Sequence, residues 1–370
     1  MKHNWEYKQF TDIATSITPR IKVDKSDYLL EGPVPIISQE ESYISGYWDN
    51  LDDITPHNGP VIIFGDHSRV LKYVDCDFVV GADGVKIISP KDCICAKFLF
   101  HFLKWYNIPS LGYSRHFKLI KDATFPVPSI ETQMQIVAEL DKINETIEDC
   151  RELLRNLDAL AQSLFYDFFG DPAINPKGWR IYKIKDICSV NPTKREIRIP
   201  TSSEISFLPM EDLPINARYF TPIKVKTLNE VQNSYTYFSG EDVLFAKVTP
   251  CFENGKAGIP VNLINNIGFG SSELFVLRPN FQIINREYIY SFIRTNHFVS
   301  EAIKKLSGTS GLRRVPRTVV ENFQIPVPPL ELQEKFAERI EQIEEQKKIV
   351  ENTIAELQTL LDSRMDYWFN

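Results

Sequence analysis

Two stretches of the chain share a spacing of apolar residues that predicts long helices. From Ile136 the apolar positions recur at steps of four and three residues as far as Phe168. A seam with this average spacing is typical of a coiled coil. The second stretch keeps the same register from Phe336, with Lys347 and Arg364 as charged interruptions. The residues expected at the seam are Ile136, Leu140, Ile143, Ile147, Leu154, Leu157, Phe336, Ile340, Ile343, Val350, Ile354 and Leu357.

The start of each predicted helix is marked by proline and acidic residues. Pro128 and the pair at 328–329 lie just before the two helices, and proline is tolerated there because the first turn needs no backbone donor. Glu131 and Glu331 then fall in the first turn, where the helix dipole favours negative charge. A helix of roughly 40 residues is about 60 Å long.

The sequence contains an internal duplication. Residues 125–170 align with 325–370 without a gap, so that F-P-V-P-S-I-E-T-Q-M-Q-I lies over I-P-V-P-P-L-E-L-Q-E-K-F. A fainter similarity extends upstream, with changing offsets that indicate unequal loops in similar folds. We therefore predict four segments in the order globular, helical, globular, helical: 1–128, 129–170, 171–328 and 329–370.

Both globular segments have the mixed pattern of an α+β fold. Short β-rich runs such as V-I-I-F at 61–64 and L-F-V-L at 274–277 are separated by Gly, Pro and Asn. The stretches 95–106 and 286–298 are amphipathic and predict helices. Two helical copies in one chain favour antiparallel pairing, with the globular units at opposite ends around an approximate two-fold axis. The alternative is that the helices serve only as a dimerisation stalk.

The charge is distributed unevenly along the chain. The total of 42 Lys+Arg against 49 Asp+Glu gives −7, which ordinarily counts against a nucleic-acid partner. However, 129–170 has nine acids and three bases, and 329–370 has ten acids and five bases, so the helices carry −11. The remaining segments carry −2 in 1–128 and +6 in 171–328. The acidity therefore belongs to the helices.

Basic residues of the globular segments gather in four loops that also contain Gly and small polar residues, at 65–69, 112–118, 246–256 and 307–317. Arg and Lys on short loops suit phosphate contact and guanine recognition, and Asn suits adenine. The alternative is that each loop is an ordinary solvated charged loop. The candidate DNA-binding residues are His67, Ser68, Arg69, Arg115, His116, Lys118, Lys247, Asn254, Lys256, Arg313, Arg314 and Arg317.

No catalytic, metal or membrane signature stands out in the sequence. The six cysteines form no C-x-x-C pair, so neither a metal cluster nor a disulfide framework is expected. The chain has no ATP-binding loop and no dinucleotide fingerprint, and the turn at Asn191 lacks the second proline and the aromatic of an amino-methyltransferase element. No apolar run is long enough for a membrane span, so we expect a cytoplasmic protein.

The duplicated helix starts, F-P-V-P-S-I-E-T-Q at 125–133 and I-P-V-P-P-L-E-L-Q at 325–333, resemble the specificity subunits of type I restriction-modification enzymes. The element V-T-P-C-F-E-N-G-K at 248–256 and G-D-H-S-R at 65–69 are also similar to elements of that family. The resemblance implies a non-catalytic reader of double-stranded DNA. Its two target-recognition domains would each bind one half of a bipartite, asymmetric site, separated by the two helices. The first copy departs from the more typical P-L-E-x-Q pattern.

The resemblance also implies partners and cofactors. Two modification subunits would dock on the helices and bring S-adenosylmethionine to methylate adenine, and restriction (motor-nuclease) subunits would join them. ATP and magnesium are expected on those partners, and no cofactor on this chain. Two other functions stay open at this point. A coiled-coil scaffold would bind proteins only, and a self-sufficient nuclease or methyltransferase would need a cofactor site that the motif search missed.

Overall fold

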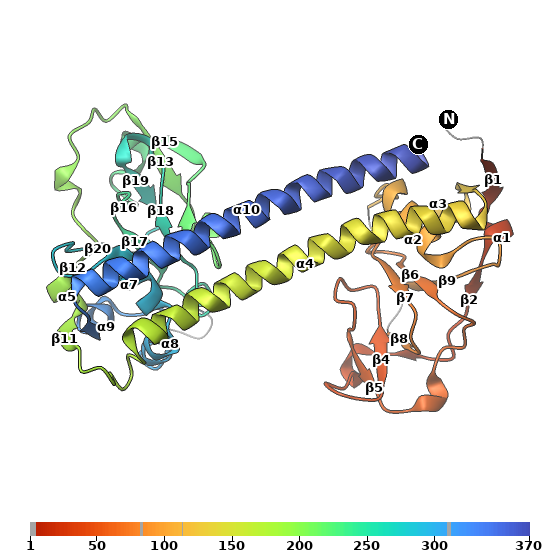
Figure 1. The fold of residues 1–370 in the computed structure, drawn as a ribbon, viewed down its shortest axis with the longest axis horizontal. Coiled ribbons are helices and arrows are strands. Elements are labelled where there is room, and N and C mark those ends of the chain that lie inside the picture. The colour runs from red at the N-terminus through yellow and green to blue at the C-terminus, as the bar shows by residue number, and fades with distance from the viewer. Residues whose placement is uncertain (1–4, 82–83, 113, 309–311) are drawn as a thin grey trace. The chain divides into compact units, whose positions relative to one another are not determined.

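The structure is a computed structural model that describes residues 5–81, 84–112, 114–308 and 312–370. It divides into two compact units, one made of Met1–Glu152 and Glu351–Asn370 and the other of Leu153–Val350. We call them unit 1 and unit 2. Each combines one of the predicted globular segments with part of both long helices (Figure 1). None of the helices among the described residues has the length and apolar character that crossing a membrane requires.

The two predicted long helices are present. They are α4 (Ile130–Phe169) and α10 (Leu330–Phe369), each 40 residues long. In unit 2, Phe336 of α10 packs against Phe169 of α4, with ring centroids 5.0 Å apart. Eleven residues further along α10, the Lys347 ammonium lies 2.8 Å from Asp158, which is earlier in α4. The helices are therefore antiparallel in this unit, as predicted.

The predicted seam is buried or partly buried along both helices. Ile136, Leu140, Phe336 and Ile340 are completely buried. The other seam residues near the middle of the helices are partly buried: Leu154, Val350, Ile354 and Leu357. The charged interruption at Lys347 is also buried, and its ammonium is neutralised by Asp158 and Glu344.

At the C-terminal ends of both helices the buried positions are shifted by one residue from the predicted seam. Phe169 and Phe369 are buried there, whereas their neighbours Phe168 and Trp368 are only partly covered. The reason is that the ends pack on the globular parts as well as on the other helix. The Phe369 ring lies 5.6 Å from Phe98 in unit 1, and the Phe169 ring lies 4.8 Å from Tyr288 in unit 2.

The described residues of unit 1 form two four-stranded sheets and one strand pair. Its strands are β1 (Glu6–Gln9), β2 (Ala14–Ile17), β3 (Lys22–Val23), β4 (Val34–Ile37), β5 (Gly46–Trp48), β6 (Val61–Gly65), β7 (Leu71–Val74), β8 (Val79–Gly81), β9 (Val85–Pro90) and β10 (Thr124–Val127). Its short helices are α1 (Phe10–Ile13), α2 (Ala96–Tyr106) and α3 (Phe117–Lys121). The sheet orders are β2-β9-β6-β7 and β3-β8-β4-β5, and β1 pairs with β10. The core lies between the first sheet, α2 and the two long helices.

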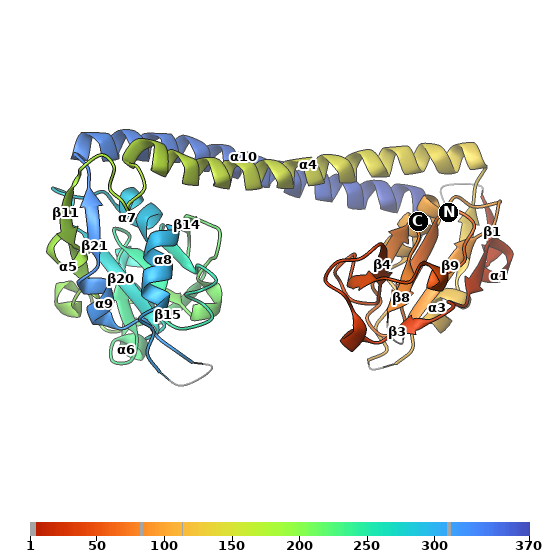
Figure 2. The same ribbon diagram turned by 90° about the horizontal axis from the view of Figure 1, so that it is seen from below.

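Unit 2 has the same plan with additions. Its strands are β11 (Arg180–Lys183), β12 (Cys188–Val190), β13 (Glu204–Leu208), β14 (Tyr219–Phe220), β15 (Lys224–Thr227), β16 (Thr236–Phe238), β17 (Val243–Ala246), β18 (Ala257–Pro260), β19 (Gly268–Gly270), β20 (Leu274–Pro279) and β21 (Gln324–Val327). Its short helices are α5 (Ile184–Ile187), α6 (Leu228–Val231), α7 (Arg286–Ile293), α8 (Asn296–Ile303) and α9 (Arg317–Glu321). The sheet orders are β12-β20-β17-β18-β14 and β15-β13-β19-β16, with β11 paired to β21. Figure 2 shows β11 and β21 side by side, with α5 and α9 close to them.

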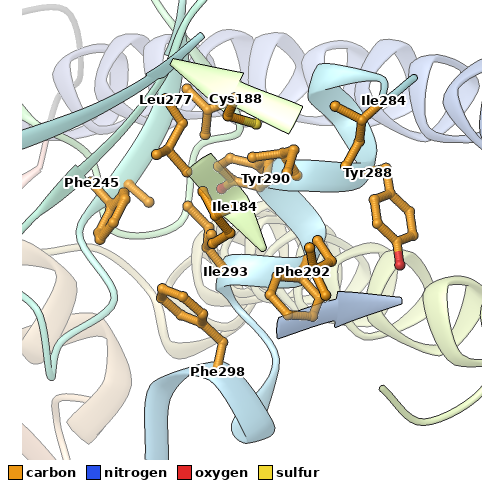
Figure 3. Close-up of a cluster of buried hydrophobic side chains, with 14 of the residues drawn as sticks. Ile184, Cys188, Phe245, Leu277, Ile284, Tyr288, Tyr290, Phe292, Ile293 and Phe298 are labelled. Atoms are coloured by element: carbon orange, nitrogen blue, oxygen red, sulfur yellow. The ribbon is translucent and has the colours of Figure 1, made fainter. Parts of the chain in front are cut away.

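The core of unit 2 is rich in aromatic side chains. Figure 3 shows part of it, where Phe245 of β17, Phe292 of α7 and Phe298 of α8 lie among aliphatic residues from α5 and β20. The stretch 286–298, predicted as one amphipathic helix, is in fact two. Thr295 separates them, because its side chain accepts a hydrogen bond from the Phe298 N–H and so begins α8.

The duplication predicted from the helices extends through both units. The strand pairs β1·β10 and β11·β21 correspond, as do the parallel pairs β4·β8 and β13·β19. The offset of 200 residues reaches back to α3 and α9, since they begin at Phe117 and Arg317. The units differ at one edge strand, because β3 is parallel to β8 whereas β16 is antiparallel to β19.

Candidate nucleic-acid interface

In unit 1, the loops 65–69 and 112–118 lie next to each other. The His116 N–H donates to the Asp66 carbonyl at 2.9 Å, and the Phe117 N–H donates to the Asp66 carboxylate at 2.8 Å. Asp66 is almost completely buried, so both bonds are shielded from water. The turn after β6 is therefore fixed to the start of α3, and two loops that are 50 residues apart in sequence form one surface.

His116 has a different role from the one predicted. It is 1% exposed, and both ring nitrogens are engaged. The Leu111 N–H donates to Nε2 at 3.0 Å, and Nδ1 lies 2.8 Å from the Asp66 carbonyl oxygen. A ring with no accessible polar atom cannot contact DNA directly in this conformation. We correct the prediction accordingly: His116 shapes the loop that carries its neighbour Arg115.

The other predicted residues of unit 1 divide into engaged and unengaged side chains. Arg69 donates to the Ile108 carbonyl at 3.0 Å, and the Ser68 hydroxyl donates to the Gln39 carbonyl at 2.7 Å. His67 is exposed in the same turn. Arg115 and Lys118 are exposed, and their side chains form no hydrogen bond or ion pair with any described residue. These two side chains are the best placed to meet a phosphate.

Two further lysines lie beside this surface, and the sequence did not single them out. The ammonium of Lys86, on β9, lies 6.0 Å from the centre of the Phe117 ring, and that of Lys121, on α3, lies 5.3 Å from it. The Lys86 ammonium is also 3.9 Å from the Asp66 carboxylate. For Lys121, the sequence offers one indication: it follows Lys118 by three residues, so the two lie one turn apart on the same face of α3. Lys86 is brought there by the sheet.

In unit 2, the predicted loops 246–256 and 307–317 also lie together. The Thr249 N–H donates to the Arg313 carbonyl at 2.9 Å, and the Arg313 N–H donates to the Thr249 hydroxyl at 3.1 Å. A third bond runs from the Val315 N–H to the Lys247 carbonyl at 2.9 Å. Residues 309–311 of the second loop lie outside the described part of the chain. Each unit thus joins its two predicted loops by backbone hydrogen bonds.

Most basic side chains of the unit 2 loops are bound within the protein. Arg314 makes a two-pronged contact with Glu273 at 2.9 Å, which lowers the pKa of that carboxyl group. Lys247 donates to the Ser272 carbonyl at 2.6 Å, and Lys256 donates to two backbone carbonyls at 2.8 and 3.0 Å. Arg317 contacts the Glu321 carboxylate at 2.7 Å. These four side chains stabilise the loops.

Asn254 and Arg313 make the fewest side-chain contacts among the predicted unit 2 residues. Both are exposed, and the side chain of Asn254 forms no hydrogen bond with any residue in the described ranges. The Arg313 guanidinium is 3.6 Å from the Glu253 carboxylate, an exposed pair that water screens. An amide and a guanidinium at one surface suit hydrogen bonding to base edges as well as to phosphate.

The chain matches the sequence model of a known protein family over residues 2–157 and 176–359. The family is described as the type I restriction modification DNA specificity domain. Among individual proteins, the EcoAI specificity subunit of Escherichia coli is 38% identical over 168 residues, which are 45% of this chain and 28% of that protein. The EcoEI specificity subunit is 38% identical over 154 residues, or 42% of this chain and 26% of that protein. The chain therefore spans about a quarter of the length of these relatives.

A more distant relative matches over nearly its whole length. The MjaIX specificity subunit of Methanocaldococcus jannaschii is 22% identical, covering 94% of this chain and 88% of that protein. Two solved structures share the fold. One is a chain from a study of complex assembly and conformational transition of the type I R-M system, with a TM-score of 0.56 and 18% identity. The match covers 99% of this chain and 97% of that chain. The other is the S subunit of the type I restriction-modification system from M. genitalium, with a TM-score of 0.54 and 12% identity. The match covers 98% of this chain and 95% of that chain.

Proposed function

Since this chain belongs to the type I restriction-modification DNA specificity family, we propose that it reads the DNA sequence for such an enzyme. It supplies recognition and does not itself cleave or methylate DNA. The observation that carries the proposal is the repeated loop pair, 65–69 with 112–118 in unit 1 and 246–256 with 307–317 in unit 2, each joined by backbone hydrogen bonds. Two equivalent surfaces in one chain suit a target with two half-sites.

The two surfaces differ in sequence, so the two half-sites differ as well. Unit 1 presents Arg115 and Lys118, whereas unit 2 presents Asn254 and Arg313. Because base recognition depends on the donors and acceptors that reach the groove, different side chains read different bases. The target is accordingly bipartite and asymmetric, with a spacer of unread base pairs between its halves.

The long helices are the docking surface for two modification subunits. Apolar side chains that the seam does not use are exposed on both helices, including Met134, Leu160 and Leu360. Exposed apolar residues at the surface of an otherwise acidic helix pair suit helix packing with a partner. The modification subunits bring S-adenosylmethionine, and the restriction subunits that complete the enzyme bring the ATP and magnesium sites.

The proposal is tested by co-expressing this chain with the modification subunit of its own restriction-modification system and mapping methylated adenines in DNA exposed to the complex. We expect one bipartite, asymmetric motif with a fixed spacer. The duplex containing this motif should bind the complex with an affinity that falls as salt rises. A complex without salt-dependent affinity for duplex DNA would instead support a protein-binding scaffold.

The assignment of one half-site to each unit is tested by exchange. Residues 1–128 are replaced by the corresponding segment of a family member with a different target. One half of the methylated motif should change while the other half stays the same. If both halves changed, the two units would not be independent readers.

A further inference from the structure

Gln133 lies in the first turn of α4 and is completely buried. Its side-chain amide makes three hydrogen bonds. The NH₂ group donates to the Pro128 carbonyl at 2.9 Å and to the Cys93 carbonyl at 3.1 Å, and the oxygen accepts from the Cys95 N–H at 2.7 Å. Cys95 is the residue that precedes α2. One side chain therefore joins the start of the long helix to the start of the globular helix packed beside it.

Gln333 makes the same three bonds at the start of α10. Its NH₂ group donates to the Pro328 carbonyl at 2.8 Å and to the Ile283 carbonyl at 3.1 Å. Its oxygen accepts from the Asn285 N–H at 2.8 Å, and Asn285 precedes α7. Gln333 is also completely buried. The arrangement is thus repeated in both units with nearly equal distances.

Only an amide satisfies these partners. Two carbonyl oxygens require donors, one N–H requires an acceptor, and glutamine supplies both from a single planar group. Glutamate would accept the N–H bond but offer its negative charge to the two carbonyls, and an apolar residue would leave all three backbone groups unsatisfied in the interior. These three bonds explain why both helices have glutamine at this position. Helix formation alone does not require it.

Two of the three bonds join the same pair of elements in both units, the start of the long helix and the segment before α2 or α7. Two residues separate the long helix from β10 or β21. The glutamine ties the first helical turn to the segment before α2 or α7, and so restrains the direction of the long helix relative to the globular part of the same unit.

We propose that Gln133 and Gln333 are positioning residues that set the spacer length between the two DNA half-sites. This inference rests on the proposed function, because it assumes that each unit reads one half-site. The glutamines touch no DNA. Each holds one long helix at a fixed angle to the reading surface of its unit, so that only one separation of half-sites is accepted.

The test uses the complex with its modification subunit and a pool of duplexes in which the half-sites are constant and the spacer length varies. Gln133→Met keeps the size of the side chain and removes all three bonds. We expect the half-site bases to stay the same, while methylation of duplexes with a spacer one base pair longer or shorter rises about tenfold relative to the preferred spacer. Gln333→Met should have the same effect through the other unit.

The matched control is Gln135→Met, two residues along α4, where the side chain is exposed and forms no hydrogen bond with the described residues. It should leave the spacer preference unchanged. Should the Gln133→Met chain fail to assemble, the Gln333→Met chain provides the same measurement through the other unit. An assembled variant with an unchanged spacer preference, or with altered half-site bases, overturns the proposal. If the unmodified complex reads no bipartite site, the proposed function fails instead.

Discussion

At the scale of single residues, the number of basic residues in the loops of each unit does not indicate how many of them are free to contact DNA. The loops of unit 2 contain more basic residues, yet Arg314 and Arg317 are bound to the carboxylates of Glu273 and Glu321. In unit 1, the side chains of Arg115 and Lys118 have no hydrogen-bond or ion-pair partner among the described residues. A basic side chain that is already paired with a carboxylate neutralises a DNA phosphate less well, so fewer counterions are released from the DNA on binding. The loops of unit 1, although they contain fewer bases, therefore offer the more available positive charge.

This difference predicts the salt dependence of DNA binding. Arg115→Ala together with Lys118→Ala should reduce the slope of log affinity against log salt by about two, since each phosphate contact contributes about one. The matched double variant, Arg314→Ala with Arg317→Ala, should reduce it by less. Both are measured on the complex with modification subunits over a series of salt concentrations. Equal slopes for the two variants would mean that the internal ion pairs open on binding.

At the scale of elements, the two long helices are held together by different charged contacts in each unit. In unit 1, Glu139 of α4 accepts hydrogen bonds from Arg364, at 3.1 Å from Nη2, and from the indole N–H of Trp368 at 2.9 Å. In unit 2, the buried ammonium of Lys347 is held by Asp158. These contacts flank the apolar seam, and they make the pairing of the helices sensitive to charge.

The contact in unit 1 predicts an acid dependence. Hydrogen bonds from Arg364 and then Trp368 lower the pKa of Glu139 from its usual 4.5. Because the pKa is lower in the folded chain, the stabilisation is fully present above pH 4.5 and is lost as the pH falls through the folded-state pKa. Wild-type protein should therefore lose more stability than Glu139→Gln between pH 5 and 3 in urea unfolding followed by circular dichroism.

The control for the acid dependence is Glu145→Gln. Glu145 is an exposed residue of the same helix, 3.9 Å from Lys142. Its substitution should leave the pH dependence of the wild type in place, because exposed pairs of this kind contribute little. A Glu139→Gln variant with the full acid dependence of the wild type would show that other carboxylates are responsible.

At the scale of the whole molecule, the boundary between the units crosses both long helices. It falls after Glu152 in α4 and after Val350 in α10. Each helix is continuous across this boundary. The seam is only partly buried here, at Leu154 and Val350. A change of helix length at these two points leaves the globular part of each unit intact.

We expect insertions at this boundary to change the spacer and nothing else. Seven residues inserted after Glu152 and seven after Val350 add about 10 Å to each helix and keep the apolar seam in phase. Methylation mapping should then give the original half-sites separated by a longer spacer. Insertion into α4 alone is the control. It makes one helix longer than the other, so the apolar residues of the seam no longer face each other, and assembly should be reduced. An unchanged spacer with altered half-sites would exclude a measuring role for the helices.

The sequence by itself determined the helices, the duplication and the family. Periodicity and proline placement predicted helices at 129–170 and 329–370, and the structure has them at Ile130–Phe169 and Leu330–Phe369. Such features are local or repeated, so they can be recognised without knowing which segments meet. The four candidate loops were also recognised locally, from their basic and small residues.

Only the tertiary structure decided which of the candidate side chains remain available. The pairing of Arg314 with Glu273 joins residues 41 positions apart, and the burial of His116 depends on Asp66, 50 positions away. The bonds of Gln133 and Gln333 to the segments before α2 and α7 are equally remote in sequence. Hydrogen bonds and burial of this kind depend on how the chain returns on itself, because a side chain is satisfied or exposed according to neighbours that the local sequence does not name.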